Sequence, residues 1–518
     1  MLKSRLCIAF FAFAVGCAPA QKPLTDYVNP MLGTATLWDS VDLGFKPTKR
    51  TWGAEVFPGS SLPNAMVQVS PVTKFHSGAG YQYEDSVIYG FTHTNKGHWN
   101  LCHIPLLPVT GTPTPGDYCS PFSHERESAA PGYYQVFLDR YGVDAQLSST
   151  LRCAFHKYTY PAGAAPAVLA DLQRSNEHVR AWDIRKEGDN VFAGWQQTGE
   201  KMYFYAVANR PVTGIEPVVE GDREVRIVRF GEGDGALELR IGFSFVSEKN
   251  ARENLEAEML GKSFAEVRSE ATATWNDLLG RIRVEGGTER EKGLFYSSLY
   301  RSFLWPALRS DVNGEFTDVD GKVINPGFRY YTGPSYWDDY RNKLILLGML
   351  APDVAADVIS SDVDKGEKRG GFMPTFFHGD HASAFVAGTY LRGNRGFDVN
   401  RAYNLVLRNA TVQGPSRPWL DEYVAKGYIS EMDVENPVTW TVCKAAVTKT
   451  LEYSYDDYAV ALLADALGDK ENRDMLMKRT SNYKNLFDPS TGLMRGRLEN
   501  GEWITPFDDQ YPYYEYMY

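Results

Sequence analysis

The chain has 518 residues, 43% of them hydrophobic and 23% charged, which are the proportions of a globular protein too long for one ordinary core. Its formal net charge is −11 and it has no long basic run, which argues against nucleic-acid binding, because that needs a concentrated positive face. Two or three domains are therefore expected.

Residues 1–20 have the pattern of a secretion signal. Lys3 and Arg5 precede an apolar stretch, residues 6–15, that is too short to span a bilayer permanently. Two cleavage patterns compete: residues 14–17 resemble a bacterial lipobox that would lipidate Cys17, and residues 18–20 fit ordinary signal peptidase. We therefore predict an exported protein, periplasmic or anchored to the outer membrane of a Gram-negative bacterium, with an N-terminal lipid as its only membrane attachment.

Four further cysteines would lie in an oxidising compartment. They allow three disulfide pairings and also suit separate buried thiols, and the sequence does not choose between these. No Cys-x-x-Cys pair is present, which argues against a zinc ribbon or a thioredoxin site. The four are Cys102, Cys119, Cys153 and Cys443.

Residues 22–250 are predicted to form an antiparallel β-sandwich. Short alternating runs are separated by clusters of Gly, Pro, Asn and Asp. Because no helical period lies between these runs, a large sandwich is favoured over an α/β fold. The runs are 66–69, 134–138, 155–160, 202–207 and 237–243.

The pattern then becomes helical. Residues 251–287 are predicted to be a helical linker, because apolar residues recur at helical spacing until Gly286-Gly287 ends the segment. From residue 288 helices dominate. The turn signals Asn313-Gly314 and Asp320-Gly321 predict a small β excursion near 310–325. The fold class is thus multidomain β + α, an arrangement common among carbohydrate-active enzymes. The helices expected are 290–308, 337–350, 352–362, 381–393, 398–411, 437–453, 456–467 and 470–485.

Residues 330–341 combine several aromatics with Asp338, Asp339 and Arg341. Neutral sugars are bound by such sets, because an aromatic face such as that of Trp337 covers the apolar side of the ring and carboxylates accept its hydroxyl hydrogens. The alternative is structural: the two aspartates would sit in the first turn of a helix, where the dipole favours negative charge. This stretch alone supports both interpretations equally.

Glycosidic bonds are usually cleaved by two carboxyl groups. Residues 452–457 are interpreted mainly as a helix cap and a solvated face, whereas Asp508, Asp509 and Glu515 lie in an aromatic, proline-containing loop of the kind that collects binding groups. The full set of candidates is Asp338, Asp339, Asp380, Asp421, Glu422, Glu452, Asp456, Asp457, Asp508, Asp509 and Glu515.

Two histidine-rich loops are candidates for ligand contact. Neither residues 378–381 nor residues 92–103 match a zinc pattern, so a loop lining a polar pocket and a substrate-facing loop are favoured over metal sites. Residues 311–314 and 318–321 echo calcium loops but lack the remaining ligands, so turns are preferred there. The substrate-binding residues predicted from these loops are His93, His98, Trp99, His378 and Asp380.

Eight tracts together resemble one family, glycoside hydrolase family 92, the exo-acting α-mannosidases of bacteria. Each tract by itself is weak evidence for the resemblance, but the eight occur in the family's order over nearly the whole mature chain. They are residues 27–34, 57–71, 90–94, 295–304, 311–321, 337–341, 370–374 and 450–458.

The resemblance implies an N-terminal β-sandwich on a C-terminal (α/α)6 barrel, with the active site between them. It implies a calcium-dependent inverting hydrolase that releases mannose from mannose-containing glycans, with an acid and a base roughly 6.5–9.5 Å apart. Trp337 and Asp338 match the family's W-D motif and would lie in the terminal-mannose subsite.

The chain departs from the family pattern in two places. After Thr94 it has Asn95-Lys96-Gly97 where the family often has His and a Ser-Gly-rich loop, which bears on linkage preference. The family's general acid is a Glu in an E-G/A-N-x-W motif, whereas Glu515 is followed by Tyr-Met-Tyr. We therefore predict that the acid and base lie beyond Tyr518, that the barrel is incomplete, and that this chain alone has little catalysis. The alternatives are a glycoside phosphorylase and a non-catalytic glycan-binding lipoprotein.

Overall fold

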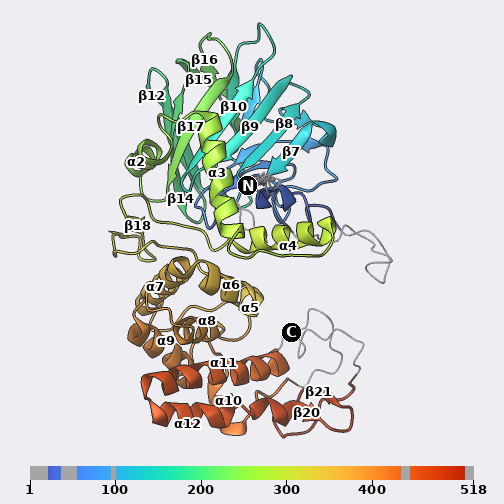
Figure 1. Cartoon of the computed structure of the whole chain (residues 1–518), viewed down its shortest axis with the longest axis vertical. Coiled ribbons are helices and arrows are strands. Elements are labelled where there is room, and N and C mark those ends of the chain that lie inside the picture. The colour runs from blue at the N-terminus through green and yellow to red at the C-terminus, as the bar shows by residue number, and fades with distance from the viewer. Residues whose placement is uncertain (1–21, 37–54, 95–100, 433–443, 508–518) are drawn as a thin grey trace, which may run out of the picture.

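Two bodies are stacked along the long axis of the molecule, a β-rich one formed by the N-terminal half and a helical one formed by the C-terminal half (Figure 1). The computed structural model describes residues 22–36, 55–94, 101–432 and 444–507. The predicted secretion signal, and with it Cys17, lies outside these residues.

The β-rich body is the predicted antiparallel sandwich, built from two large sheets. Alternation places one face of each strand in the core; in β14, for example, every second side chain is buried. One sheet has the order β1 (Ser60–Ser61), β2 (Gln68–Val72), β4 (Gly90–Thr92), β5 (Leu106–Val109), β11 (Ala167–Ala170), β16 (Arg223–Phe230) and β15 (Val212–Glu220). The other has the order β12 (Ala181–Gly188), β13 (Val191–Gln197), β14 (Lys201–Ala208), β17 (Leu237–Ser244), β10 (Cys153–Thr159), β9 (Val143–Ser149), β8 (Tyr133–Leu138) and β7 (Glu127–Ala130).

The predicted linker is two helices that cover the sandwich, α2 (Glu248–Glu258) and α3 (Phe264–Leu279). A capping box starts α3: the Ser263 hydroxyl accepts from the Glu266 amide, and the Glu266 carboxylate accepts from the Ser263 amide. The indole of Trp275, wholly buried, donates to the Ser61 carbonyl at 2.7 Å. The linker is therefore packed into the β-rich body. Helix α4 (Glu289–Ser302) then crosses between the two bodies (Figure 1).

The helical body differs from the sequence prediction at several boundaries. The expected helices 437–453 and 456–467 are one continuous α11 where described, because no Gly or Pro interrupts residues 446–467. The expected helix 337–350 is broken, and α10 was missed. The predicted β excursion is the hairpin β18 (Phe316–Thr317) and β19 (Val323–Ile324). The helices are α5 (Tyr336–Asp339), α6 (Lys343–Leu350), α7 (Pro352–Lys368), α8 (Ala382–Leu391), α9 (Val399–Thr411), α10 (Leu420–Lys426), α11 (Ala446–Leu467) and α12 (Lys470–Arg479).

Buried polar contacts join the two bodies. The Arg152 side chain, between β9 and β10, donates from Nε to the Ser310 carbonyl at 2.8 Å and from Nη1 to Glu258 at 2.7 Å. Asp311 accepts from the Ser244 hydroxyl and the Asn254 amide, both at 2.6 Å. Residues 311–314 are thus a turn held by sandwich side chains, as preferred from the sequence.

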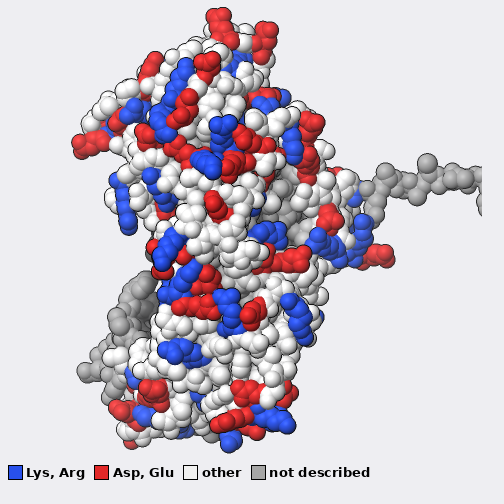
Figure 2. Space-filling view, turned by 90° about the vertical axis from the view of Figure 1, so that its left-hand side faces the viewer, with Lys and Arg blue, Asp and Glu red and all other residues white. Residues whose placement is uncertain are grey.

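Among the described residues, no single helix is long and apolar enough to cross a membrane; α6 and α7 reach that length only together, with a bend of 119° at the break between them. On the face in Figure 2, basic and acidic side chains are intermixed over both bodies. Cys119 and Cys153 are free thiols, and burial raises the pKa of Cys153.

Candidate functional site

Helix α5 and the loop before α8 bring together residues that are forty positions apart in the chain. The Trp337 ring lies edge-on to Phe377, with centroids 5.3 Å apart, and 6.4 Å from His378. Phe377 is 54% exposed and Trp337 is half-buried. Burial and the nearby Lys449 ammonium lower the pKa of His378 to about 4, so its imidazole is neutral at physiological pH. The predicted residues Trp337 and His378 therefore share one aromatic surface.

The backbone around this surface is strained at three non-glycine residues. Phe377, Trp419 and Ala445 have φ values of 64°, 57° and 51°, in the left-handed region. Lys449 connects two of them, because its ammonium lies 5.2 Å from the Trp419 ring and its backbone N–H donates to the Ala445 carbonyl, and its charge also acts on His378, next to Phe377. Such residues cost about 1–3 kcal/mol each and collect at functional sites. This strain supports a binding role for the surface.

The two aspartates of α5 have different environments. Asp339 is buried, accepts from the Ser335 amide at 3.2 Å and pairs with Lys343 at 3.2 Å. Asp339 therefore holds the first turn of α5, and its contact with substrate stays a prediction. Asp338, by contrast, is exposed beside Trp337. The structural interpretation of this stretch therefore applies to Asp339, and a sugar contact of Asp338 stays a prediction.

Arg341 lies across the same surface. Its Nη1 donates to the Trp337 carbonyl at 3.0 Å, its guanidinium lies 4.4 Å from the Tyr340 ring, and its Nη2 is 3.6 Å from Glu452 Oε1. Burial raises the pKa of the Glu452 carboxyl. The side of α11 that carries Glu452 therefore faces α5.

Below this surface is a cluster of buried charges. His381 Nδ1 bonds to Asp456 at 2.9 Å, and Arg417 pairs with Asp457 at 2.6 Å and with Asp380 at 3.3 Å, all with fully buried side chains. Burial raises the pKa of Asp380 to about 6. The interpretation of 452–457 as a solvated face is therefore wrong, and Asp380 cannot contact a substrate as predicted.

The sequence contained a signal for this cluster. Tyr453, Asp456, Asp457 and Val460 have the i, i+3, i+4, i+7 spacing of a core-facing stripe, and all four are buried. Two carboxylates in an apolar stripe need buried partners, which His381 and Arg417 supply from distant segments. The partner could not be identified from the pattern of α11 alone.

The histidine-rich loop of the sandwich is separate from this surface where described. His93 is wholly buried, with Nε2 2.9 Å from His156 Nε2 and Nδ1 2.9 Å from the Ile104 carbonyl, and burial lowers its pKa to about 3. The prediction of a substrate-facing His93 is therefore wrong. His98, Trp99, Asp508, Asp509 and Glu515 lie outside the described residues.

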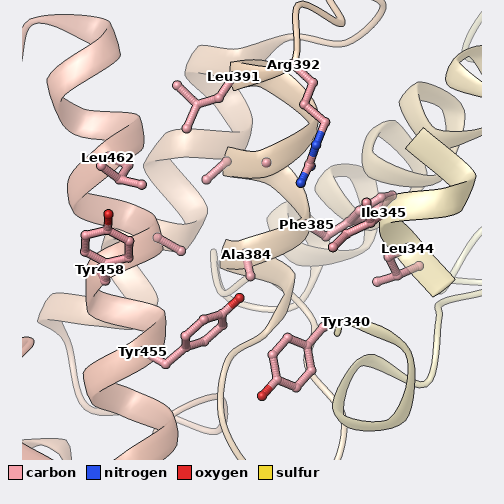
Figure 3. A pocket seen from close by; sticks show the side chains of 13 residues that line it. Tyr340, Leu344, Ile345, Ala384, Phe385, Leu391, Arg392, Tyr455, Tyr458 and Leu462 are labelled. Atoms are coloured by element: carbon pink, nitrogen blue, oxygen red, sulfur yellow. The ribbon is translucent and has the colours of Figure 1, made fainter. Parts of the chain in front are cut away.

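A cavity of about 310 Å³ lies on the inner side of Tyr340 (Figure 3). Tyr340, Tyr455 and Tyr458 surround its opening between α6, α8 and α11, and Arg392 is the one charged residue in its wall. Because no carboxylate lines it, this cavity lacks the groups that glycosidic cleavage needs. The remaining wall residues are Leu344, Ile345, Ala384, Phe385, Ala387, Gly388, Leu391, Ala459 and Leu462.

The described acidic, histidine and cysteine side chains do not gather into a metal-binding cluster. In residues 22–36, 55–94, 101–432 and 444–507, no three His, Cys, Asp or Glu side chains are placed to hold one metal ion. The carboxylates near the aromatic surface have other partners: Asp380 and Asp457 pair with Arg417, and Asp456 pairs with His381. No metal ligand is therefore assigned.

Both halves of the chain match known domains. Residues 27–253 match the Glycosyl hydrolase family 92 N-terminal domain, and residues 250–517 match the Glycosyl hydrolase family 92 catalytic domain. The border between the two matches falls in α2.

Solved structures share this architecture, and a curated protein is similar in sequence. A family GH92 alpha-mannosidase from Bacteroides thetaiotaomicron is 27% identical, with a TM-score of 0.84 over 94% of this chain and 68% of that one. A family GH92 inverting mannosidase from the same organism is 25% identical, with a TM-score of 0.81 over the same shares. An uncharacterized secreted glycosidase of Arthroderma benhamiae is 24% identical over 92% of this chain. The chain spans 66% of that protein's length.

Proposed function

Because the chain belongs to glycosyl hydrolase family 92, we propose that it is an α-mannosidase that removes terminal α-linked mannose from mannose-containing glycans. The observation that carries this proposal is the partly exposed aromatic surface formed by Trp337 and Phe377, with Asp338 and Arg341 beside it. A similar mannosidase, 28% identical, was solved in complex with mannoimidazole, which supports mannose as the sugar.

Each of these residues has a role that its chemistry allows. Trp337 and Phe377 would cover the apolar C–H face of the terminal sugar. Asp338 would accept hydrogen bonds from its hydroxyls, and Arg341 would donate to them. A sugar ring held in this way is oriented before the glycosidic bond is cleaved. Such orientation lowers the activation barrier of the reaction.

The proposed chemistry is inverting hydrolysis in the cleft between sandwich and (α/α)6 barrel. A general acid would protonate the glycosidic oxygen while a base activates water on the opposite face of the sugar. No described carboxylate is assigned either role. Glu515, a catalytic candidate from the sequence that departs from the family's acid motif, lies outside the described residues. Calcium dependence is part of the proposal on family grounds only, and no step is derived through the ion.

Export is also proposed. The N-terminal pattern of Lys3, Arg5 and an apolar stretch supports it, and so does the similarity to a protein described as a secreted glycosidase. Attachment through a lipid at Cys17, and a periplasmic or outer-membrane position, belong to the same proposal.

The test is an assay of the full chain with α-mannobioses of each linkage and with methyl α-mannoside. Release of mannose that appears first as the β-anomer by proton NMR would support inverting hydrolysis. Release of mannose 1-phosphate only when phosphate is present would point to a phosphorylase. Saturable binding without release would contradict hydrolysis by this chain and favour a glycan-binding role for it.

A further inference from the structure

His381 lies between two carboxylates in the interior of the helical body. Its Nδ1 is 2.9 Å from Asp456 Oδ1, and its Nε2 is 3.3 Å from Glu452 Oε2. The imidazole is wholly buried, and Nε2 has no hydrogen-bonding partner of good geometry in the described part of the chain. The contact with Glu452 is therefore mainly electrostatic, and with Glu452 ionised it is attractive only if both ring nitrogens carry protons.

The charges of the buried cluster favour the same protonation state when Asp380, whose pKa burial raises to about 6, is ionised. Asp380, Asp456 and Asp457 contribute three negative charges, and Arg417 and Arg479 contribute two positive ones. One negative charge is left over, and an unbalanced buried charge is expensive. An imidazolium at His381 supplies the missing positive charge.

Two routes connect this buried ring to the exposed surface. Along the first, Glu452 lies between His381 Nε2 and Arg341 Nη2, which is 3.6 Å from its other oxygen. Along the second, the Tyr340 ring stacks on the imidazole, with centroids 3.7 Å apart and planes at 10°, and the Arg341 guanidinium lies 4.4 Å from the Tyr340 centroid. Both routes end on the arginine that also bonds to the Trp337 carbonyl.

We propose that His381, as an imidazolium, is a positioning residue of the sugar site: it fixes Glu452 and Tyr340 and, through them, holds Arg341 in place to meet the substrate. This inference rests on the proposed function, because it assigns Arg341 to substrate contact. His381 itself touches no substrate.

The surroundings of the ring set the direction of its pH dependence. Burial lowers the pKa of His381, but the carboxylates of Asp456, Glu452 and Asp380 outweigh burial and raise it above its ordinary value. The other groups that face the ring are Tyr340 and Tyr455. The imidazolium form of His381 therefore persists above pH 6.5, the ordinary pKa of histidine, and is lost as pH rises through the higher pKa of the folded protein. Sugar affinity should accordingly fall with rising pH.

Two readouts test the proposal, each on the full chain. The first is the affinity for methyl α-mannoside between about pH 5.5 and 9. The wild type should lose affinity as pH rises. H381Q should bind roughly tenfold more weakly at the low end of this range, since misplaced contacts cost this much or more, and the difference should shrink as the wild-type imidazolium loses its proton. E452Q should resemble H381Q, and H124Q, in the sandwich, should resemble the wild type.

The second readout is NMR and does not need sugar binding. The imidazole nitrogens of His381 should both be protonated at neutral pH, and the Arg341 Nε–H should be rigid in the wild type but mobile in H381Q and E452Q. A neutral His381 ring, or an equally rigid Arg341 in folded H381Q, would overturn the proposal. If the wild type binds no mannoside, the proposed function fails, and the Arg341 dynamics still decide whether His381 positions it.

Discussion

Arg417 and Asp457 form a salt bridge, 2.6 Å from Nη1 to Oδ1, in which neither side chain has any exposed surface. Arg417 lies on the loop before α10 and Asp457 in the middle of α11, so this pair joins two elements forty residues apart. Asp380 shares the same guanidinium, which makes Arg417 the centre of the buried cluster.

Replacing Arg417 with Met should destabilise the helical body by about 3–5 kcal/mol, because it leaves the carboxylates of Asp380 and Asp457 buried without their partner. Urea unfolding followed by circular dichroism measures this. The matched control is R401A, whose pair with Glu367 is about half exposed on both sides and should contribute less than about 1 kcal/mol. Equal effects of R417M and R401A would contradict the argument.

Asp311 should make the folded state more stable in acid. Burial raises its pKa from 3.8 to about 6, although Ser244 and Asn254 donate to it. Between these values the folded protein binds more protons than the unfolded one, so this contribution to stability decreases as pH rises, by about 3 kcal/mol in total. In D311N the amide can keep both contacts, and the difference in unfolding free energy from wild type should vary across this pH window. A constant difference would refute the raised pKa.

Gly242 allows α2 to lie directly on the sandwich. A Cβ there would come within 2.1 Å of the Ala251 carbonyl oxygen and 2.8 Å of Leu255 Cβ. G242A should therefore cost at least about 1–3 kcal/mol, with a lower melting temperature of the β-rich body. G214A is the control, because a Cβ at Gly214 would meet no atom within 4 Å. A G242A protein as stable as G214A would show that α2 does not pack as described.

Trp337 should contribute to sugar affinity and little to stability. W337A removes the half-buried ring that meets Phe377 and should weaken binding of methyl α-mannoside by about 1–3 kcal/mol, the range for a lost stacking or burial contact. F487A is the control, because Phe487 is an aromatic, 44% exposed, on the strand β20 (Phe487–Asp488) and is not part of this surface. Titration calorimetry of both variants and the wild type measures the difference. Unchanged affinity in W337A would remove this surface from the proposed site.

Calcium removal should abolish hydrolysis if the proposed mechanism is correct. Dialysis against EDTA followed by the mannobiose assay measures this, and added calcium, but not added magnesium, should restore activity, because the two ions differ in preferred ligand number and geometry. The melting temperature of the part of the chain that the structure describes should change little, since no group of three His, Cys, Asp or Glu side chains is placed there to hold a metal ion. Full activity after chelation would contradict calcium dependence.

The sequence by itself determined the order of the two bodies. Alternating runs separated by turn residues predicted the strands of the sandwich, and helical spacing predicted α2 and α3. Burying one face imposes a period of about two residues on a strand and of about 3.6 residues on a helix. The hairpin at residues 316–324 followed from its turn residues, and eight local motifs identified the family.

Tertiary structure alone decided which polar residues are exposed. Asp338 and Asp339 are neighbours in the sequence, yet one is exposed and the other pairs with Lys343. Asp456 and Asp457 were interpreted as solvated, although their partners His381 and Arg417 come from distant segments. A local pattern gives the direction of a side chain along its own helix, but the burial and charge of that side chain depend on what packs against it.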